Sequence, residues 1–378
     1  MTPELELTQA LIRCRSITPD DAGCMELIAA RLQPLGFTVE WLNFEQTRNV
    51  WIRRGQQAPL FVFLGHTDVV PSGPLEAWAS DPFEPEICDG VLYGRGAADM
   101  KSSVAAMVVA LERFIADCPD HEGSIALLLT SDEEGTAVDG VVKVVEVLSA
   151  RAEKIDWCLV GEPSSFDVLG DVVRVGRRGS LCAELQVFGV QGHVAYPEKA
   201  ENPIHGFAPV LHELTAAVWD NGNDFFPPTR LQVSNIQAGT GAENVIPGSL
   251  RAQFNFRFST EVTEQALKQR VEEILKKYGL RYELAWRLSG APFLTTGARL
   301  LDAVQQALLQ VTGRQARADT GGGTSDGRYI APTGAEVVEL GPLNASIHKA
   351  NECIPVADIT GLVHIYGRIL SNLLQRKK

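Results

Sequence analysis

A buried strand that ends in a histidine and an aspartate is the feature that most constrains this chain. The apolar run 61–64 predicts a strand inside a sheet, and His66 and Asp68 follow at its end. Because side chains alternate along a strand, both residues point to the same side. A histidine with a carboxylate two residues on is a pairing that orients an imidazole for metal binding. Alone, the pairing is equally consistent with a purely structural role.

A glycine-rich turn then leads to a second acidic residue, Asp99, which lies just before a helical pattern at 102–114. Strand ends and helix N-termini are where open α/β sheets place their chemistry. On its own, Asp99 could equally cap its helix.

Strands and helices alternate along the first 160 residues of the chain. Helices are predicted at 3–15, 22–33, 102–114 and 141–150, and strands at 37–43, 49–53, 60–64, 125–130 and 157–160. Three of these strands end in acidic or histidine residues that precede a turn or a helix. This alternation predicts an α/β fold with a mixed, mostly parallel sheet flanked by helices.

The pattern changes near residue 180. The following elements are predicted: strand 181–190, helix 203–220, strands 230–236 and 250–258, helix 261–278 and strand 280–287. This order is that of a ferredoxin-like α+β domain. After Pro292 the earlier alternation returns, with helix 299–312, strand 335–340 and helix 356–375. We therefore expect residues 180–292 to be inserted into a discontinuous domain of residues 1–179 and 293–378, and a chain of 378 residues favours two domains.

Composition excludes several classes of protein. A hydrophobic content of 45% with 21% charged residues is typical of a soluble globular protein, and no apolar run approaches the ~20 residues of a membrane span. The net charge of −13 argues against a nucleic-acid partner and means that an anionic substrate needs a local cluster of arginines. Seven scattered cysteines, with no visible signal peptide, predict a cytoplasmic protein.

The residues that could carry chemistry share a position at loops, and all are histidine or carboxylate. They are His66, Asp68, Asp99, Glu133, Glu134, Glu162 and His348. Such a set without cysteine suits zinc, cobalt or manganese in a catalytic site with an open position. The set is large enough for two metal ions, with one carboxylate bridging and one left as a base. Each residue alone could be a solvated charge or a surface histidine, but four segments ending this way favour a shared site.

Four motifs resemble those of the dinuclear-zinc aminoacylase and carboxypeptidase family. They are Gly65-His66-Thr67-Asp68-Val69-Val70-Pro71, Gly94-Arg95-Gly96-Ala97-Ala98-Asp99-Met100-Lys101, Ser131-Asp132-Glu133-Glu134-Gly135 and Gly161-Glu162-Pro163. The resemblance spans the whole chain in order, with no motif missing. It implies a zinc-exopeptidase-like catalytic domain, an inserted dimerisation and lid domain, a homodimer, and a hydrolase of linear amides.

Two further runs narrow the resemblance: Gly176-Arg177-Arg178-Gly179-Ser180-Leu181 and Gly321-Gly322-Gly323-Thr324-Ser325-Asp326-Gly327-Arg328. Together with the length, they resemble the members that cleave N-succinyl-LL-2,6-diaminopimelate in lysine and cell-wall precursor biosynthesis. Acetylornithine deacetylase and other N-acyl-amino-acid hydrolases of the family keep the same ligands and remain an alternative. A non-catalytic binding module is a second alternative, although neither the base nor any ligand is lost.

The resemblance also implies roles for the residues of the site. His66, Asp99 and Glu162 would hold one zinc ion. Asp99, Glu134 and His348 would hold the other, so that Asp99 bridges the pair, and Co²⁺ can replace Zn²⁺. Asp68 would orient His66, and Glu133 would be the general base. The peptide bond after Asp99 is implied to be cis.

In the inserted domain, the resemblance implies that His193 stabilises the oxyanion of the reaction from the other subunit. A histidine in a glycine-rich loop is by itself unremarkable, Asn244 could be a turn residue before a proline, and Arg257 could be an exposed strand residue. Arginine forks suit the three carboxylates of the implied substrate. The predicted substrate contacts are Arg178, Ser180, Tyr196, Asn244, Arg257, Thr324 and Asn344, and Arg177 and Arg328 are further candidates.

Overall fold

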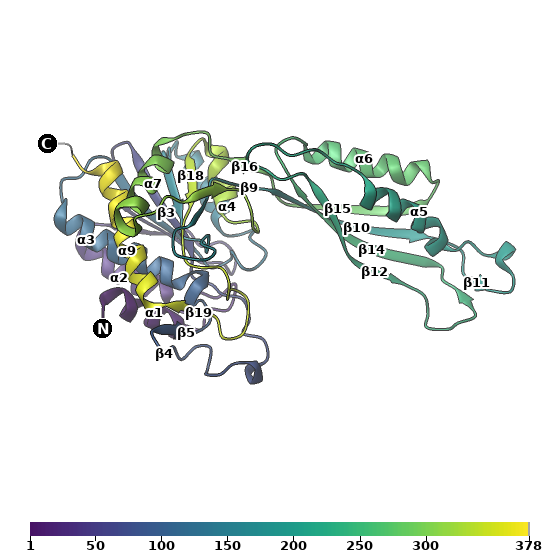
Figure 1. The fold of residues 1–378 in the computed structure, drawn as a ribbon, viewed down its shortest axis with the longest axis horizontal. Coiled ribbons are helices and arrows are strands. Elements are labelled where there is room, and N and C mark those ends of the chain that lie inside the picture. Colours follow the sequence, from purple (N-terminus) through teal and green to yellow (C-terminus); the bar gives the residue numbers. More distant parts are fainter. Residues whose placement is uncertain (377–378) are drawn as a thin grey trace. The chain divides into compact units, whose positions relative to one another are not determined.

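The computed structural model describes residues 1–376, and the chain divides into two compact units (Figure 1). Unit 1 comprises Met1–Gly176, Leu294–Asp319 and the chain from Ser325 onward. Unit 2 comprises Arg177–Phe293 and Thr320–Thr324. The predicted insertion of residues 180–292 lies inside the first segment of unit 2, and the short second segment overlaps the start of the glycine-rich run 321–328.

Unit 1 is built on an eight-stranded sheet with the order β1-β2-β6-β3-β7-β18-β8-β17. The bounds of its strands are Thr38–Trp41 (β1), Asn49–Arg54 (β2), Leu60–His66 (β3), Ser124–Thr130 (β6), Trp157–Val160 (β7), Val172–Arg174 (β8), Arg317–Asp319 (β17) and Glu336–Glu339 (β18). The four inner strands β6, β3, β7 and β18 run parallel, whereas β1 and β2 pair antiparallel at one side. The predicted mixed, mostly parallel sheet of the α/β class is confirmed.

Helices cover both faces of this sheet because its central strands are apolar on both sides. Phe61 and Phe63 of β3 point into the larger core, which also contains residues of α1, α2, α3, α7 and α9. The alternate residues of β3, Val62 and Leu64, are equally buried and face the side of α4 and α8. The helices are α1 (Pro3–Arg13), α2 (Cys24–Leu32), α3 (Ser102–Asp117), α4 (Val141–Ala150), α7 (Arg299–Thr312), α8 (Gly327–Ile330) and α9 (Val356–Leu374).

Several short elements of unit 1 escaped the sequence analysis because three residues are too few for a periodic pattern. A three-stranded sheet joins β19 (Cys353–Pro355), β5 (Val91–Tyr93) and β4 (Glu86–Cys88) in that order. It ties the segment after His348 to the glycine-rich turn before Asp99. Further short pieces outside the body of unit 2 are η1 (Gln33–Leu35), η2 (Leu75–Ala77), η3 (Ala97–Lys101), η5 (Ala331–Thr333), β9 (Gly176–Arg177) and β16 (Phe293–Leu294).

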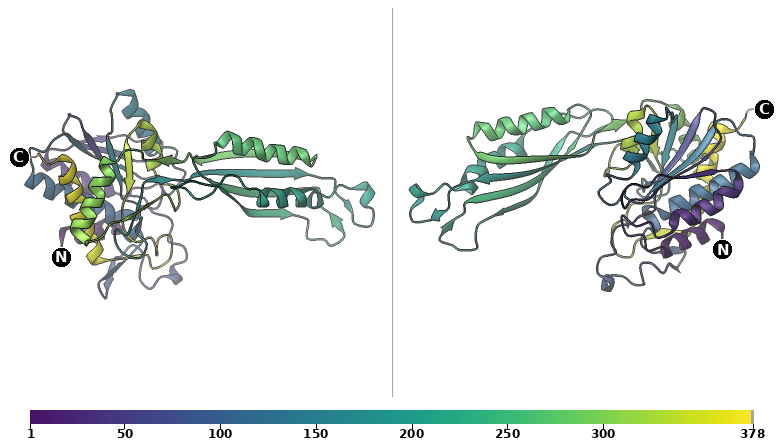
Figure 2. Two further views of the ribbon diagram at one scale, coloured as in Figure 1. Left: turned by 45° about the horizontal axis from the view of Figure 1, so that its top comes forward. Right: turned by 180° about the vertical axis from the view of Figure 1, so that it is seen from behind.

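Unit 2 has the predicted strand-helix-strand-strand-helix-strand order. Its elements are β10 (Gly179–Phe188), α5 (Pro203–Ala216), β12 (Arg230–Ala238), β14 (Ser249–Phe258), α6 (Glu264–Lys277) and β15 (Arg281–Gly290), with the small pieces β11 (Gly192–His193), η4 (Pro197–Lys199) and β13 (Val245–Ile246). The four long strands form an antiparallel sheet in the order β12-β14-β10-β15. Figure 2 shows both helices on one face of this sheet, while its other face is free of helices.

Alternation along the strands explains why the helices of unit 2 cover only one face. Leu181, Leu185, Phe254 and Phe256 are buried against α5 and α6, and the residues between them are mostly polar. The helix predicted over 203–220 was too long, because α5 ends at Ala216. In the loop that follows, the Asp220 carboxylate accepts hydrogen bonds from the N–H groups of Gly222 and Thr229 and so stabilises a turn.

Among the residues that the structure describes, no helix combines the length and the apolar character needed to cross a bilayer.

Candidate active site

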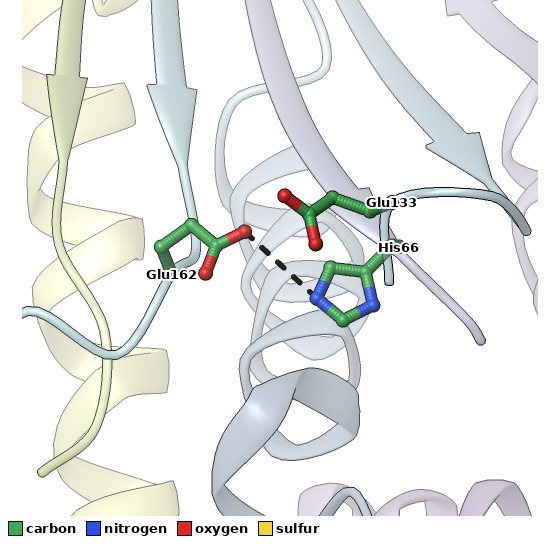
Figure 3. A group of neighbouring side chains, drawn as sticks. All are labelled: His66, Glu133 and Glu162. Atoms are coloured by element: carbon green, nitrogen blue, oxygen red, sulfur yellow. Dashed lines mark ion pairs between the residues drawn. The ribbon is translucent and has the colours of Figure 1, made fainter. Parts of the chain in front are cut away.

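His66 is the last residue of β3, and its imidazole is buried among carboxylates. On one side, Nδ1 lies 2.9 Å from the backbone oxygen of Asp68. A proton on Nδ1 is donated to this oxygen, which leaves Nε2 to face the site. On that side, Nε2 lies 3.3 Å from Oδ1 of Asp99 and 3.8 Å from Oε1 of Glu162, which follows β7 (Figure 3). The ring is therefore oriented as in metal-binding histidines.

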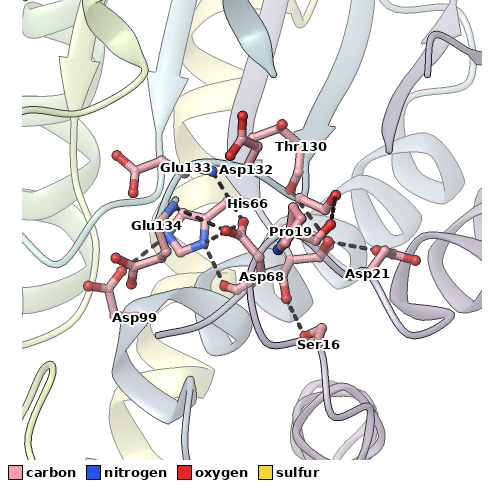
Figure 4. Close-up of polar contacts among 12 residues, drawn as sticks. Ser16, Pro19, Asp21, His66, Asp68, Asp99, Thr130, Asp132, Glu133 and Glu134 are labelled. Carbon is pink, nitrogen blue, oxygen red and sulfur yellow. Dashed lines mark hydrogen bonds and ion pairs between the residues drawn. The ribbon is translucent and has the colours of Figure 1, made fainter. Parts of the chain in front are cut away.

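Asp68 links the end of β3 to the loop after β6. Its fully buried carboxylate accepts hydrogen bonds from the N–H groups of Glu133 (3.4 Å) and Glu134 (3.1 Å) (Figure 4). The same carboxylate lies 3.6 Å from Nδ1 of His66, farther than the Asp68 backbone oxygen. The orientation of His66 is thus shared between the main chain and the side chain of Asp68.

Asp99 is held in place by a residue that the sequence analysis missed, Glu352. The buried Glu352 carboxylate accepts hydrogen bonds from the N–H groups of Gly96 (2.9 Å), Ala98 (2.8 Å) and Asp99 (2.9 Å). It also pairs with Nη1 of Arg95 at 2.7 Å. Nothing in the sequence around Glu352 indicated this role, because all four partners lie more than 250 positions away. The peptide bond after Asp99 is cis, as the resemblance implied.

The Asp99 carboxylate lies between two histidines. Its Oδ1 faces His66, and its Oδ2 is 3.4 Å from Nε2 of His348. Nε2 of His348 is also 3.0 Å from Oε1 of Glu134. A carboxylate with one oxygen toward each histidine has the geometry that a bridging ligand needs.

Glu133 comes from the same loop as Glu134 but groups with different neighbours. Ligand atoms of His66, Glu133 and Glu162 lie within 4.8 Å of one another, and so do those of His66, Asp99 and Glu134. Burial raises the pKa of Glu133 well above its ordinary value, and the nearby carboxylates of Glu162 and Asp326 raise it further. A carboxyl with a raised pKa is suited to accept a proton.

The donor set fits a pair of divalent cations. Two imidazole nitrogens and several carboxylate oxygens converge without a thiolate, which suits zinc, cobalt or manganese. The carboxylates of the cluster also need positive charge beside them, as the pKa values of Asp99 and His348 indicate. Burial would raise the pKa of Asp99, but hydrogen bonds to His348 and His66 hold it well below its usual range. Asp99 and Glu134 in turn raise the pKa of His348 to about 10.

The predicted substrate contacts are divided between the units. Arg178, Ser180, Tyr196, Asn244, Arg257 and Thr324 belong to unit 2, as does His193, whereas Asn344 belongs to unit 1. The Asn344 N–H donates to the Ser165 carbonyl.

Within unit 2, Nδ1 of His193 accepts a hydrogen bond from the Ala195 N–H at 3.0 Å, and the exposed His193 ring lies 5.8 Å from the ring of Tyr196. The Asn244 carbonyl accepts from the Val194 N–H, so His193, Tyr196 and Asn244 lie close together.

Asp326 is a second residue that the sequence analysis did not single out. Both of its carboxylate oxygens are buried without a hydrogen-bond partner among the described residues, and the nearest cation is Nη2 of Arg328 at 3.8 Å. Burial raises the pKa of Asp326 to about 6, although Arg328 opposes this. The glycine-rich run 321–328 was the available signal, but its pattern does not say which member is buried.

Sequence comparison identifies the family. The sequence model of peptidase family M20/M25/M40 matches residues 62–372 of this chain. The chain belongs to this family.

Full-length relatives agree with the M20 assignment. The chain is 67% identical over 374 residues to the succinyl-diaminopimelate desuccinylase of Methylococcus capsulatus, with 99% of each chain covered. It is 62% identical to the enzyme of the same name from Nitrosococcus oceani, covering 99% of this chain and 100% of the relative. The M20 chain described here is therefore an enzyme that hydrolyses amides, and the alternative of a non-catalytic module is set aside.

Solved M20 structures share the fold at low identity. A metallo-carboxypeptidase from Sulfolobus solfataricus matches with a TM-score of 0.82 at 17% identity, covering 98% of this chain and 99% of the other. A dinuclear metal-binding peptidase from Bacillus subtilis matches with a TM-score of 0.73 at 16% identity, covering 97% and 96%. The zinc-exopeptidase-like architecture expected from the motifs is thereby confirmed at the level of the fold.

We predict that Glu352→Gln weakens the metal site without touching a ligand. The side-chain amide would present an NH₂ group to the N–H donors of Gly96, Ala98 and Asp99. It would also lose the ion pair with Arg95, so that the Arg95 guanidinium would be buried without a counter-charge. The free energy of unfolding should fall by about 3 kcal/mol, and metal affinity by roughly 10- to 100-fold. Urea denaturation and titration with a competing chelator measure the two effects. Glu6→Gln on the exposed side of α1 is the control, and an unchanged metal affinity in Glu352→Gln would contradict the role.

We also predict that metal binding releases protons at neutral pH. In the metal-free protein His348 keeps its proton up to a pH of about 10, whereas a metal ion binds only the neutral imidazole. The apparent metal affinity should therefore rise with pH until about pH 10. Proton release measured in weakly buffered solution at saturating metal should be about one proton smaller for His348→Gln. Equal release by both proteins would show that His348 is neutral before metal binds.

Proposed function

We propose that this enzyme cleaves N-succinyl-LL-2,6-diaminopimelate to succinate and LL-2,6-diaminopimelate, a step of lysine and cell-wall precursor biosynthesis. The observation that carries the proposal is the 60–67% identity, over nearly the full length, to several curated relatives of the name succinyl-diaminopimelate desuccinylase. Identity of this degree over nearly the full length covers far more of the chain than the four metal-site motifs. We propose the cytoplasm as its compartment, in keeping with seven free cysteines.

Two zinc ions per subunit are the proposed cofactors, and Co²⁺ can replace them. His66, Asp99 and Glu162 would hold one ion, and Asp99, Glu134 and His348 the other. The convergence of these side chains on the Asp99 carboxylate supports this assignment. When bound, the ions supply Lewis acidity that polarises the amide carbonyl and lowers the pKa of water in the site.

Glu133 is the proposed general base. Its carboxylate would take a proton from the attacking water and return it to the leaving nitrogen, since amide cleavage needs the amine to leave protonated. A raised pKa supports this role, because proton transfer is most efficient when the pKa of the base is near the working pH. Asp68 positions this loop by accepting hydrogen bonds from both Glu133 and Glu134.

Arginines of unit 2 would bind the carboxylates of the substrate. Arg178 and Arg257 are the proposed charged contacts, with hydrogen bonds from Ser180, Tyr196, Asn244, Thr324 and Asn344. Support comes from the sheet register, which pairs Ser180 directly with Arg257. Because the whole chain carries a net charge of −13, local arginines are needed to attract an anion.

The main competing function is that of a sister enzyme, such as acetylornithine deacetylase. Steady-state kinetics on N-succinyl-LL-2,6-diaminopimelate and on N-acetylornithine, with metal counted per chain, separates the two. The proposal expects chelator-sensitive turnover of the succinyl substrate and a much lower kcat/KM for the acetyl substrate. A preference for N-acetylornithine would replace the proposed function by the alternative.

We predict that Glu133→Gln retains both metal ions and loses most of its activity. The amide cannot accept the water proton, and loss of general acid–base catalysis costs roughly 10²–10⁴-fold in kcat. Steady-state assay and metal analysis of the same preparation test the assignment. Glu134→Gln is the matched control, because loss of a ligand should lower metal content as well as activity. If Glu133→Gln also loses metal, Glu133 is a ligand and another group must be the base.

The proposed homodimer leads to a further prediction about His193, which we propose acts on the partner's site. The ligands belong to unit 1, whereas His193 belongs to unit 2, and a two-fold dimer is the commonest oligomer. His193→Ala and Glu133→Gln should each be nearly inactive as homodimers. A heterodimer of the two variants, co-expressed with two tags, would contain one site with both defects and one with neither.

About half of the parent activity per heterodimer is therefore expected from this mixture. The control is a heterodimer of tagged parent and tagged Glu133→Gln, which should also retain about one functional site. If the purified mixed dimer is as inactive as both homodimers, His193 acts within its own chain or has no catalytic part.

A further inference from the structure

A row of residues crosses three strands of the unit 2 sheet at one end. Ser180 of β10 pairs in register with Arg257 of β14, and Arg257 pairs with Arg230 of β12. Directly opposed residues on neighbouring strands point to the same face of a sheet. The adjacent residues Leu231 and Phe256 are buried under the helices, so this row lies on the helix-free face.

Arg178 lies beside this row. It precedes Ser180 by two positions, and its Nη2 donates to the Gly322 carbonyl at 3.3 Å. Burial lowers the pKa of Arg178, and the charges of Arg257, Arg230 and Arg177 lower it further. Three guanidinium groups, those of Arg178, Arg230 and Arg257, are therefore close enough to repel one another.

This repulsion is not relieved by the protein itself. Within the part of the chain that the structure describes, none of the three forms an ion pair with a carboxylate, although Arg281 of the same sheet pairs with Glu201 at 2.7 Å. On the same face, Glu184 of β10 lies four residues beyond the row and accepts a hydrogen bond from Gln253. Like charges placed directly opposite each other destabilise a sheet. An arrangement with this cost, in a chain of net charge −13, is suited to an anionic ligand.

We propose that Arg230 is a specificity-determining residue that binds, together with Arg257, the substrate carboxylate farthest from the scissile amide. This inference rests on the proposed function and adds a residue to it. Exposure rises along the row, from the buried Ser180 through the partly buried Arg257 to the exposed Arg230 on the edge strand β12. This exposed member of the row would bind the remote end of the substrate. Two guanidinium forks side by side can hold one carboxylate with several charge-assisted hydrogen bonds.

The test compares two substrates that differ by a single carboxylate. Nα-succinyl-L-lysine is N-succinyl-LL-2,6-diaminopimelate without the remote carboxylate. With the diaminopimelate substrate, Arg230→Gln should lower kcat/KM by about 10- to 100-fold, mainly through KM, and leave metal content unchanged. With the lysine substrate, the parent and Arg230→Gln should have the same kcat/KM. Arg230→Lys should recover only part of the loss, because a point charge cannot replace the fork.

Arg251→Gln is the matched control, since Arg251 is an exposed arginine of the same strand as Arg257 and lies on the same face at the other end. It should behave as the parent enzyme on both substrates. Equal losses on both substrates, or no loss on either, would overturn the role of Arg230 while the parent still cleaves the diaminopimelate substrate. A parent enzyme that does not cleave that substrate at all would overturn the proposed function and this inference with it.

Discussion

The structure depends on keeping several carboxylates close together inside the protein. Asp68, Asp99, Glu134 and Glu162 surround His66, and buried negative charges are costly unless they are paired or bind a cation. The chain meets this cost in two ways. His66 and His348 face carboxylate oxygens of the cluster. Backbone N–H groups from two loops donate to Asp68 and to Glu352. The loops therefore have fixed conformations before any cation is considered, which leaves a preorganised set of ligand atoms.

The parallel arrangement of β6, β3 and β7 explains why residues at the ends of different strands lie close together. Neighbouring parallel strands end at the same edge of the sheet, so His66, Glu133 and Glu162 meet although they are far apart in the chain. This reasoning needs only apolar runs and the residues that follow them. It could not find Glu352, whose partners are set by a small sheet of three-residue strands without periodicity. The same reasoning predicted a helix up to residue 220, whereas α5 ends at Ala216. Trp219 is buried although it lies beyond the end of the helix, so its apolar side chain resembles a continuation of the helical pattern.

Unit 2 was predicted from alternating strands and two helical patterns, which follow the order of a ferredoxin-like domain. The periodicity identifies the helix-covered face but gives no chemistry to the open one. There the resemblance supplied Arg178, Ser180 and Arg257, and the register of the sheet added Arg230. The roles of His193, Tyr196 and Asn244 remain predictions, because their contacts in the described chain are with one another and with their own loop.

The bonds of Glu352 have a consequence for the order in which the enzyme can mature during synthesis. Ribosomes make a chain from its N-terminus, so β3, the Asp99 turn and the β6 loop emerge long before His348 and Glu352. Until that late segment is made, the N–H groups of Gly96, Ala98 and Asp99 lack their acceptor, and one histidine of the cluster is missing. A nascent chain therefore cannot assemble the complete site before the segment with His348 and Glu352 has been made.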